Sequence, residues 1–483
     1  MKERSYPALF LAAGAGGGAL GFIRAREEMR GLRARFHIAG AVDIDPNAVA
    51  NFGMLTGHPC TIGDLSTMTP DDLRRACPEP PRVVFSSSPC TGYSSCLGEA
   101  RSKEQRYQDL NDLAVRSFWL AMETWPGQVP PLMLLENVPG IQVRGRGRLS
   151  QIRGMFQSAG FGCRETVHNC GVLGGLAQNR LRFLMVARHH AQVPNFWMQP
   201  PALPMRTVGD VLGGLPVPLP GSTAGGPMHR LPRLSALNWL RLALIRAGGD
   251  WRDLPPAVQV GRVTVDPRSE CERREGSIGI TSWDGVSAPV IANGTLHNGP
   301  WQVADPRVQC SPRNTAYGVV GWSGPCGTVL ASACHDNGAF SVADPRAARQ
   351  VCVLDGDIPR VEVHGDSSAF LRDIAERSRR PMRPDETPVI VAADGTWHRP
   401  MTTLELAAIQ GFPTRVGGDW LVLSGGRDDL HRKAIGDAVP PPTAEAIART
   451  ALRTLMAAEH GTWELSSSGV WVEDQRDGME ASA

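Results

Sequence analysis

Apolar runs alternate with glycine-rich or polar breaks along the first part of the chain. Residues 7–22 have the pattern of a strand, a glycine loop and the start of a helix. Residues 36–52 have that of a second strand, ending in acids, and a helix. Residues 107–125 carry apolar side chains at helical spacing. Strands alternating with helices predict a parallel α/β sheet. Three further apolar runs have the length of buried strands, at 81–90, 130–140 and 178–188.

The pattern changes near residue 200. Residues 199–230 are rich in proline and glycine, and an internal repeat follows, in which the tripeptide Asp-Pro-Arg recurs every 39 residues. Asn298-Gly299 and Asn337-Gly338 keep the same spacing, and Asn-Gly is a strong hairpin-turn signal. We therefore predict a small β-rich domain of duplicated hairpins, which is either a scaffold or a binding surface. The three tripeptides start at Asp266, Asp305 and Asp344.

Composition narrows the class of protein. The 483 residues suffice for two or three domains. A hydrophobic fraction of 42% without a run of about 18 apolar residues predicts neither a membrane span nor a secretory signal. The eleven cysteines form no CxxC pair, which indicates reduced thiols in a cytosol. Of the 50 basic residues only three are lysine. Arginine suits phosphate and guanine contacts, although codon bias in a GC-rich genome would also produce this excess.

The glycine loop "AAGAGGGALGF" joins the first strand to the first helix and would let a ligand approach the backbone. Asp43 ends the next strand, where a carboxylate can accept both hydroxyls of a ribose. Asp64 ends a third strand and could accept from an adenine amino group. The pattern therefore indicates an adenosine-containing ligand, and NAD and S-adenosylmethionine both fit. ATP is disfavoured because no Walker motif is present.

Cys90 follows a strand and Pro89, at a place that can lie at the carboxyl edge of a parallel sheet. A cysteine there is either a small buried hydrophobe or a reactive thiolate. Glu136 ends another apolar run, and Arg180 and Arg182 stand on one face of a strand. A thiolate, a carboxylic acid and an arginine pair suit nucleophilic attack on an electron-poor ring that is protonated on one side.

The order of these segments resembles that of the DNA (cytosine-5) methyltransferases. The glycine loop is similar to their first motif, "VDIDPNAVANF" to the second, and "SPCTGYSS" to the Pro-Cys nucleophile motif. "LLENVPG", "QNRLR", "RPMTTLELAAIQGFP" and "AIGDAVPPPTAEAIA" resemble the later motifs in family order. The resemblance covers roughly residues 1–198 and 399–455. It implies a Rossmann-like methyltransferase sheet and a separate recognition domain for double-stranded DNA.

The resemblance also implies a mechanism. The target cytosine leaves the duplex, Cys90 adds to C6, Glu136 holds a proton at N3, and Arg182 contacts O2 with Arg180 nearby. C5 then accepts a methyl group from S-adenosylmethionine. We expect support of the DNA-binding elements from Ser94, Gln178, Arg399 and Gln410. We expect the cofactor to contact Ala13, Gly14, Gly16, Gly17, Asp43, Ile44, Asp64, Leu65, Pro89, Asp437 and Ala438.

By this resemblance, residues 1–198 form the catalytic domain, to which 425–460 returns. Residues 199–398 form the recognition domain, 399–424 its support, and 461–483 a tail. Helical patterns at 402–412 and 440–460 agree with that division.

Three positions depart from the family pattern. Ala12 stands where a phenylalanine is usual, Ser88 where a proline is, and Asp437 where an asparagine is. A carboxylate at position 437 would allow transfer of a modified group from an analogue of the donor.

Other functions remain open from the sequence. An RNA cytosine methyltransferase would share the motifs but would not need the long insert. A NAD-dependent oxidoreductase explains only the glycine loop, and an inactive DNA-binding protein leaves the catalytic set without a purpose. We expect no metal, because the spacing of Cys326, Cys334, His335 and Cys352 is not that of a usual zinc finger. We expect a cytoplasmic protein, for which a restriction endonuclease is a candidate partner that activity does not require.

Overall fold

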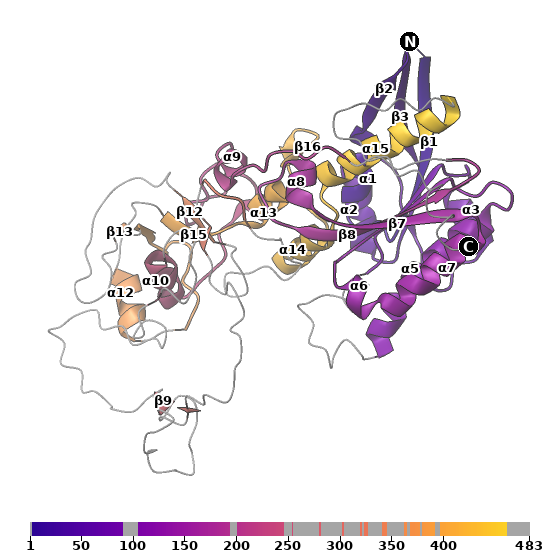
Figure 1. The fold of residues 1–483 in the computed structure, drawn as a ribbon. Helices are drawn as coiled ribbons and strands as arrows, with labels where there is room; N and C mark the ends of the chain where they lie inside the picture. The colour runs from indigo at the N-terminus through magenta and orange to yellow at the C-terminus, as the bar shows by residue number, and fades with distance from the viewer. Residues whose placement is uncertain are drawn as a thin grey trace.

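The computed structural model forms two regions, one built around a large sheet and one around a smaller sheet (Figure 1). Pro89 is the last described residue before the predicted nucleophile, so Cys90 and Ser94 lie outside the described residues, as do most of the 39-residue repeats and the tail. The residues that the structure describes are 2–89, 105–193, 200–245, 254, 280–281, 302–303, 319–320, 323–326, 341–344, 362–364, 368–376, 379–391 and 397–460.

The large sheet has the strand order β2-β3-β1-β5-β6-β8-β7, with β4 beside β3. Its central strands are buried on both faces, which explains why they read as continuous apolar runs in the sequence. The strands are β1 (Lys2–Leu11), β2 (Arg26–Met29), β3 (Leu32–Asp43), β4 (Thr61–Ile62), β5 (Val83–Ser86), β6 (Leu132–Asn137), β7 (Phe161–Asn169) and β8 (Leu181–His189).

The sheet is mixed, and the expectation of a parallel sheet is correct only for its centre. Strands β3, β1, β5 and β6 run parallel, whereas β8 is antiparallel to both β6 and β7. The reason is the connection: only a short helix and a loop join β7 to β8, which is too little for the crossover that parallel neighbours need. Strand β2 is also antiparallel to β3, and the sequence analysis did not foresee β2 or β7.

Helices cover both faces of this sheet, and the alternation along β1 shows the two layers. Ala8 and Phe10 pack with α1 and α15 on one face. Leu9 and Leu11 pack with α3, α5 and α7 on the other. The helices of this region are α1 (Gly17–Arg24), α2 (Pro46–Thr56), α3 (Pro70–Ala76), α5 (Gln105–Thr124), α6 (Ile141–Arg144), α7 (Arg146–Ser158), α8 (Cys170–Gly174) and α15 (Pro441–His460).

The last helix returns to the first part of the chain. Figure 1 shows α15, in yellow, beside the indigo elements α1 and β1. Two glycines of α1 allow the approach. A Cβ atom on Gly21 would collide with the Pro441 carbonyl and lie 2.6 Å from the Ala444 Cβ. A Cβ on Gly17 would collide with the Val439 carbonyl. The segment 439–444 therefore packs directly against the glycine loop and the start of α1.

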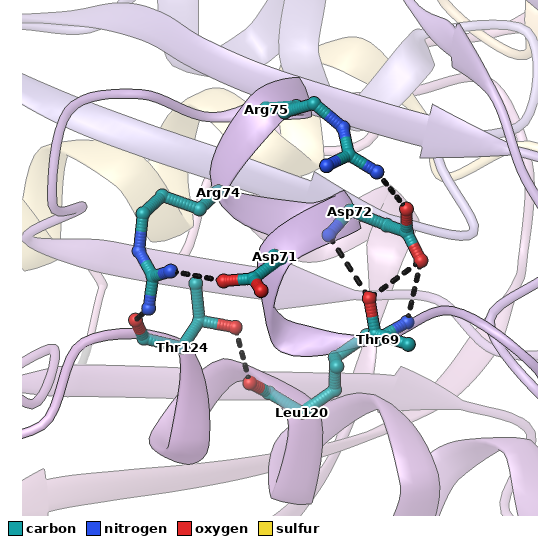
Figure 2. Close-up of polar contacts among 7 residues, drawn as sticks. All are labelled: Thr69, Asp71, Asp72, Arg74, Arg75, Leu120 and Thr124. Atoms are coloured by element: carbon teal, nitrogen blue, oxygen red, sulfur yellow. Dashed lines mark hydrogen bonds and ion pairs between the residues drawn. The ribbon is translucent and has the colours of Figure 1, made fainter.

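Helix α3 is fixed at both ends by polar contacts (Figure 2). Thr69 and Asp72 form a reciprocal capping box that starts the helix. Arg74 donates to the Thr124 carbonyl at 2.5 Å, which ties α3 to the end of α5, and also pairs with Asp71. Because α3 starts a few residues after Asp64, these contacts also hold the loop that carries Asp64.

The second region packs around a core of its own, in which the rings of Trp239 and Trp397 stack at 6.4 Å. Its five-stranded sheet has the order β11-β12-β15-β14-β13. The other described elements of the chain are α9 (Val208–Leu212), η2 (Pro227–His229), α10 (Ala236–Leu244), β9 (Ile280–Thr281), β10 (Gln302–Val303), β11 (Val319–Val320), β12 (Ser341–Asp344), β13 (Glu362–His364), α12 (Ser368–Ala375), β14 (Val389–Val391), β15 (Trp397–Pro400), α13 (Thr403–Ile409), β16 (Arg415–Val416), β17 (Asp419–Trp420) and α14 (Asp428–Asp437). Of these, α9, η2, α13 and α14 pack with Leu55 of α2 in a separate hydrophobic cluster.

The 39-residue step recurs in the strand positions, since β9 and β10 correspond to β11 and β12 at that spacing. The interpretation as duplicated hairpins is wrong for these two strand pairs, because each pairs in parallel. The Asn-Gly dipeptides that suggested hairpins lie outside the described residues.

We expect Gly21→Ala to lower the free energy of unfolding by about 1–3 kcal/mol, because the added methyl group meets backbone atoms of α15 that cannot move away easily. Gly154→Ala is the matched control: Gly154 is exposed within α7 and its Cβ would meet open space. That change should raise the free energy of unfolding by up to about 1 kcal/mol through helix propensity. Urea denaturation measures both, and equal effects would contradict the packing argument.

Candidate active site

The glycine loop leaves β1 through a strained turn. Ala12 has a φ of 53°, in the left-handed region that is costly for a residue with a Cβ atom. Ser87, from the segment that leads to Cys90, donates from Oγ to the Ala12 carbonyl at 3.0 Å. Gly14 also has a positive φ, and a Cβ there would meet nothing within 4 Å. The loop is therefore held by Ser87 at Ala12 and has open space beside Gly14, as a ligand site requires.

Asp43 lies next to this loop. Its carboxylate accepts from the Gly14 N–H at 2.8 Å and from the Asp45 N–H at 2.9 Å, one bond to each oxygen. Each oxygen keeps a further lone pair, so both can still accept from vicinal hydroxyls. Ile44, the next residue, is 63% exposed, so a large apolar side chain stands free beside the acid.

Asp64 stands on the neighbouring strand end, and the Gly63 N–H donates to the Asp43 carbonyl at 2.9 Å, which links the two acids. The Asp64 carboxylate accepts from the backbone and hydroxyl of Ser66. Leu65 is buried in the core, which gives it a packing role. Two carboxylates, an open glycine loop and an exposed isoleucine fit an adenosine-bearing ligand.

Asp437 and Ala438 end helix α14 beside this loop. Ala438 is buried, and its Cβ faces the start of α1 near Gly17. Lys433 pairs with Asp437 at 2.6 Å. Burial alone would lower the pKa of Lys433, but Asp437, Asp45 and Asp43 together raise it. The positive charge of Lys433 thus compensates the negative charge of Asp437. Lys433 also interacts electrostatically with Asp43 at the end of β3.

The segment before Cys90 is tied to both neighbouring strands. The hydroxyls of Ser86 and Ser88 share a hydrogen bond of 2.9 Å, and Asn137 donates from Nδ2 to the Ser88 carbonyl at 3.2 Å. Pro89 follows, partly buried. These contacts fix the backbone of Ser86–Ser88 beside the end of β6, just before the residues that the structure does not describe.

Glu136 and Arg182 meet at this edge. Nε of Arg182 lies 3.3 Å from Oε1 of Glu136, and both side chains are largely buried, with 12% and 9% exposed. Burial raises the pKa of Glu136 above its ordinary value, and the positive charges of Arg182 and Arg180 offset only part of that rise. A buried carboxylic acid that keeps its proton to higher pH than usual can donate a hydrogen bond to a ring nitrogen.

Strand register places a third polar side chain beside this pair. Glu136 is opposite Leu184, and His168 is opposite Arg182. Because paired residues and alternate residues share a face, Glu136, Arg182 and His168 project from the same face of three adjacent strands. No histidine was expected to have a role in the site. His168 could not be recognised from a local sequence pattern, because its neighbour Arg182 is determined by the pairing of β7 with β8.

Arg180 and Gln178 have a different setting from Arg182. Arg180 is 1% exposed and donates from Nη2 to the carbonyls of Gly436 and Ala438. Gln178 donates to Gln410 Oε1 at 2.7 Å, and Gln410 donates to the same Ala438 carbonyl at 2.8 Å. These three side chains join the segment that leads into β8 to the ends of α13 and α14. The geometry favours a bracing role for Arg180, and its catalytic role stays a prediction.

Arg399 forms a buried pair with Glu405, with Nη1 and Nη2 at 2.9 and 2.8 Å from the two carboxylate oxygens. Both side chains are 0% exposed. Burial alone would raise the pKa of Glu405, but Arg399, His229 and the Thr402 N–H lower it overall. The pair starts α13, because Glu405 completes the capping box of Thr402.

The described residues contain no group of three or more His, Cys, Asp or Glu side chains able to hold a metal ion. Of the four zinc candidates only Cys326 is described; burial raises the pKa of its thiol to about 12, only partly offset by a backbone hydrogen bond. No helix in the described ranges is long and apolar enough for a bilayer span.

Comparison with known proteins adds three findings. The family model for C-5 cytosine-specific DNA methylase matches residues 8–214 and 356–453. The type II methyltransferase M1.HphI of Haemophilus parahaemolyticus is 26% identical over 257 residues, which cover 52% of this chain and only 63% of that relative. The solved structure of the Entamoeba histolytica methyltransferase EhMeth is 13% identical, with a TM-score of 0.51 over 93% of this chain and 98% of that one, a likeness of fold alone.

We expect Arg399→Met to lower the free energy of unfolding by about 3–5 kcal/mol at pH 7, because it leaves Glu405 charged and buried without a partner. The pKa of Glu405 is lowered in the folded state, so the pair stabilises above the ordinary glutamate pKa. That contribution is lost as the pH falls, and the difference from wild type should shrink below about pH 4.

Arg427→Met is the matched control, since it breaks the exposed pair with Asp429 and should cost less than about 1 kcal/mol. Denaturant titrations at pH 7 and at acidic pH measure both variants. If both variants lost a similarly small amount of free energy of unfolding, the proposed contribution of the buried pair to stability would be contradicted.

Proposed function

The chain belongs to the C-5 cytosine-specific DNA methylase family, and from that premise we propose that it methylates C5 of a cytosine in a specific sequence of double-stranded DNA. The family and fold imply S-adenosylmethionine as the methyl donor. The proposed nucleophile is Cys90, which follows the segment held by Asn137. The proposed recognition domain is residues 199–398, and the family model leaves residues 215–355 of it unmatched.

The contact between Glu136 and Arg182 carries this proposal. Cytosine accepts a thiolate at C6 only if negative charge on the ring is relieved. A buried acid with a raised pKa can hold a proton against N3, and an adjacent arginine can donate to O2. An oxidoreductase that binds NAD would need neither group at this edge, so the pair favours cytosine chemistry over that alternative.

The remaining steps follow from these positions. The target base must leave the duplex, because C5 and C6 are out of reach in the stack. The Cys90 thiolate bonds to C6 while N3 takes the proton from Glu136, so C5 gains electron density. S-adenosylmethionine supplies an electrophilic methyl group bound to a sulfonium. C5 would take that methyl group as the bond from the methyl carbon to the donor sulfur breaks and the donor leaves as a thioether. A base then removes the C5 proton, the C6–S bond breaks, Cys90 leaves as thiolate, and N3 returns its proton to Glu136.

The Asp437–Lys433 pair bears on the alternative in which a modified group is transferred. That alternative rests on an extra negative charge at position 437, but Lys433 lies 2.6 Å from the carboxylate and compensates it. The ordinary donor therefore remains the proposal. The relative's description as a type II methyltransferase suggests a partner restriction endonuclease for this chain as well, and such a role places the enzyme on DNA in the cytoplasm.

We expect purified protein to convert cytosine to 5-methylcytosine in unmethylated plasmid DNA with S-adenosylmethionine. Cys90→Ser should reduce the rate by about a thousandfold or more, since the hydroxyl is a poor nucleophile at neutral pH. Nucleoside mass spectrometry measures the product. Cys163→Ser is a control, because Cys163 lies near the start of β7, opposite Ala187 and at the far end of the strand from His168. Product formation by Cys90→Ser at the wild-type rate would refute the assignment, and labelled RNA tests the RNA alternative.

We expect kcat/KM to fall on the alkaline side as Glu136 loses its proton, and this decline should start at a higher pH than an ordinary glutamate would give. Glu136→Gln should lower kcat by about 10²–10⁴-fold and remove this alkaline limb, because the amide does not titrate. Any acid limb should remain, because it does not depend on the Glu136 carboxyl group. An alkaline limb that persists unchanged in Glu136→Gln would show that another group controls it.

A further inference from the structure

His168 stands beside the proposed catalytic pair with an unused hydrogen-bonding atom. Its Nε2 is buried and has no hydrogen-bond partner among the described residues. Such an orphan atom costs free energy in the folded protein. The strand register puts His168 directly opposite Arg182, where side chains are close neighbours, about 5 Å apart at Cβ. The His168 side chain, with its unpaired Nε2, therefore projects from the same face of the sheet as Glu136 and Arg182.

Arg182 has complementary capacity. Its Nε faces Glu136, and its Nη1 donates to the Leu181 carbonyl at 2.8 Å. Its Nη2 donates no hydrogen bond to any described residue. A donor and an acceptor that pair with no described residue thus lie at directly opposite positions on neighbouring strands.

The charge state of the imidazole fits the role of acceptor. Burial, and then the positive charge of Arg182, lower the pKa of His168 to about 4. The ring is neutral at physiological pH, so one of its nitrogens carries a lone pair. A carboxylate in its place would draw Arg182 more strongly, but it would add a negative charge to a face whose arginines already balance Glu136.

The chemistry proposed above creates a need for such an acceptor. When Glu136 carries a proton and turns to N3 of cytosine, it no longer balances Arg182, whose side chain is only 12% exposed. We propose, on the basis of the proposed function, that His168 is a positioning residue that accepts a hydrogen bond from Arg182 at this point. Arg182 then keeps its orientation toward O2 and is held away from the acid.

The consequence can be measured on Glu136. Among the described residues, the charged and titratable groups near Glu136 are Arg182 on β8, Arg180 just before β8, and Cys170 on α8, with His168 beyond Arg182 on β7. Without His168, Arg182 stays on Glu136 and lowers its pKa, because a close positive charge favours the carboxylate. Glu136 then loses its proton at a lower pH than it does in the wild-type protein.

We expect His168→Leu to lower kcat by about tenfold or more, the effect of one hydrogen bond to a charged group. It should also move the alkaline limb of kcat/KM to lower pH, and leave KM for S-adenosylmethionine unchanged. His168→Gln, whose side chain can still accept near the position of Nε2, should recover most of both effects. Val167→Thr is the matched control, since Val167 is the preceding residue of β7, on the opposite face and 45% exposed.

Thermal unfolding separates this role from a structural one. His168→Leu removes a buried orphan atom, so its melting temperature should equal or exceed that of wild type. A lower melting temperature with an unmoved pH profile would overturn the inference, as would a kcat within twofold of wild type. If the wild-type protein forms no 5-methylcytosine on DNA, the proposed function itself fails and the inference falls with it.

Discussion

The closure of the chain's end onto its beginning is the constraint on which the site depends. The carbonyls of Gly436 and Ala438 receive hydrogen bonds from Arg180 and Gln410, and the next residue, Val439, packs on Gly17. One short segment therefore joins the start of the strand that carries Arg182, the end of helix α13, and the glycine loop. Because buried donors and carbonyls must pair, these parts cannot shift independently. The proposed donor and target-base sites are thereby held at a fixed separation.

Two buried arginine–glutamate pairs behave differently, and the number and length of their contacts are the reason. Arg399 and Glu405 are fully buried and joined by two hydrogen bonds, so both stay charged and fix the start of α13. Glu136 and Arg182 touch through one longer contact, and burial raises the pKa of the acid. The first pair stabilises the fold. In the second pair, the raised pKa lets Glu136 keep its proton to higher pH than usual, which is what proton donation to a ring requires.

Local sequence reasoning succeeded wherever a pattern of short range determines the outcome. The first strand, the glycine loop and α1 follow from an apolar run and from glycines at places of close approach. Asp43, at the end of β3, accepts a hydrogen bond from Gly14 of the loop, and Gly63, next to Asp64, donates to the Asp43 carbonyl, whereas the binding roles of both acids stay predictions. Sheet direction was only partly predicted, because it depends on the crossover between strands, and β7 and β8 lack one. For the same reason, the parallel pairs in the repeat were taken for hairpins.

The sequence by itself determined which chemistry-bearing residues the chain offers and their order, because motifs of this family are contiguous segments whose residue types follow from local needs. It thereby led to the methyltransferase family and to Glu136 and Arg182. Only the tertiary structure decided which polar groups meet. It put Arg180 on the carbonyls of α14, paired Asp437 with Lys433, and set His168 against Arg182. Those neighbours come from strand register and from packing of distant segments, and no pattern along the chain encodes either one.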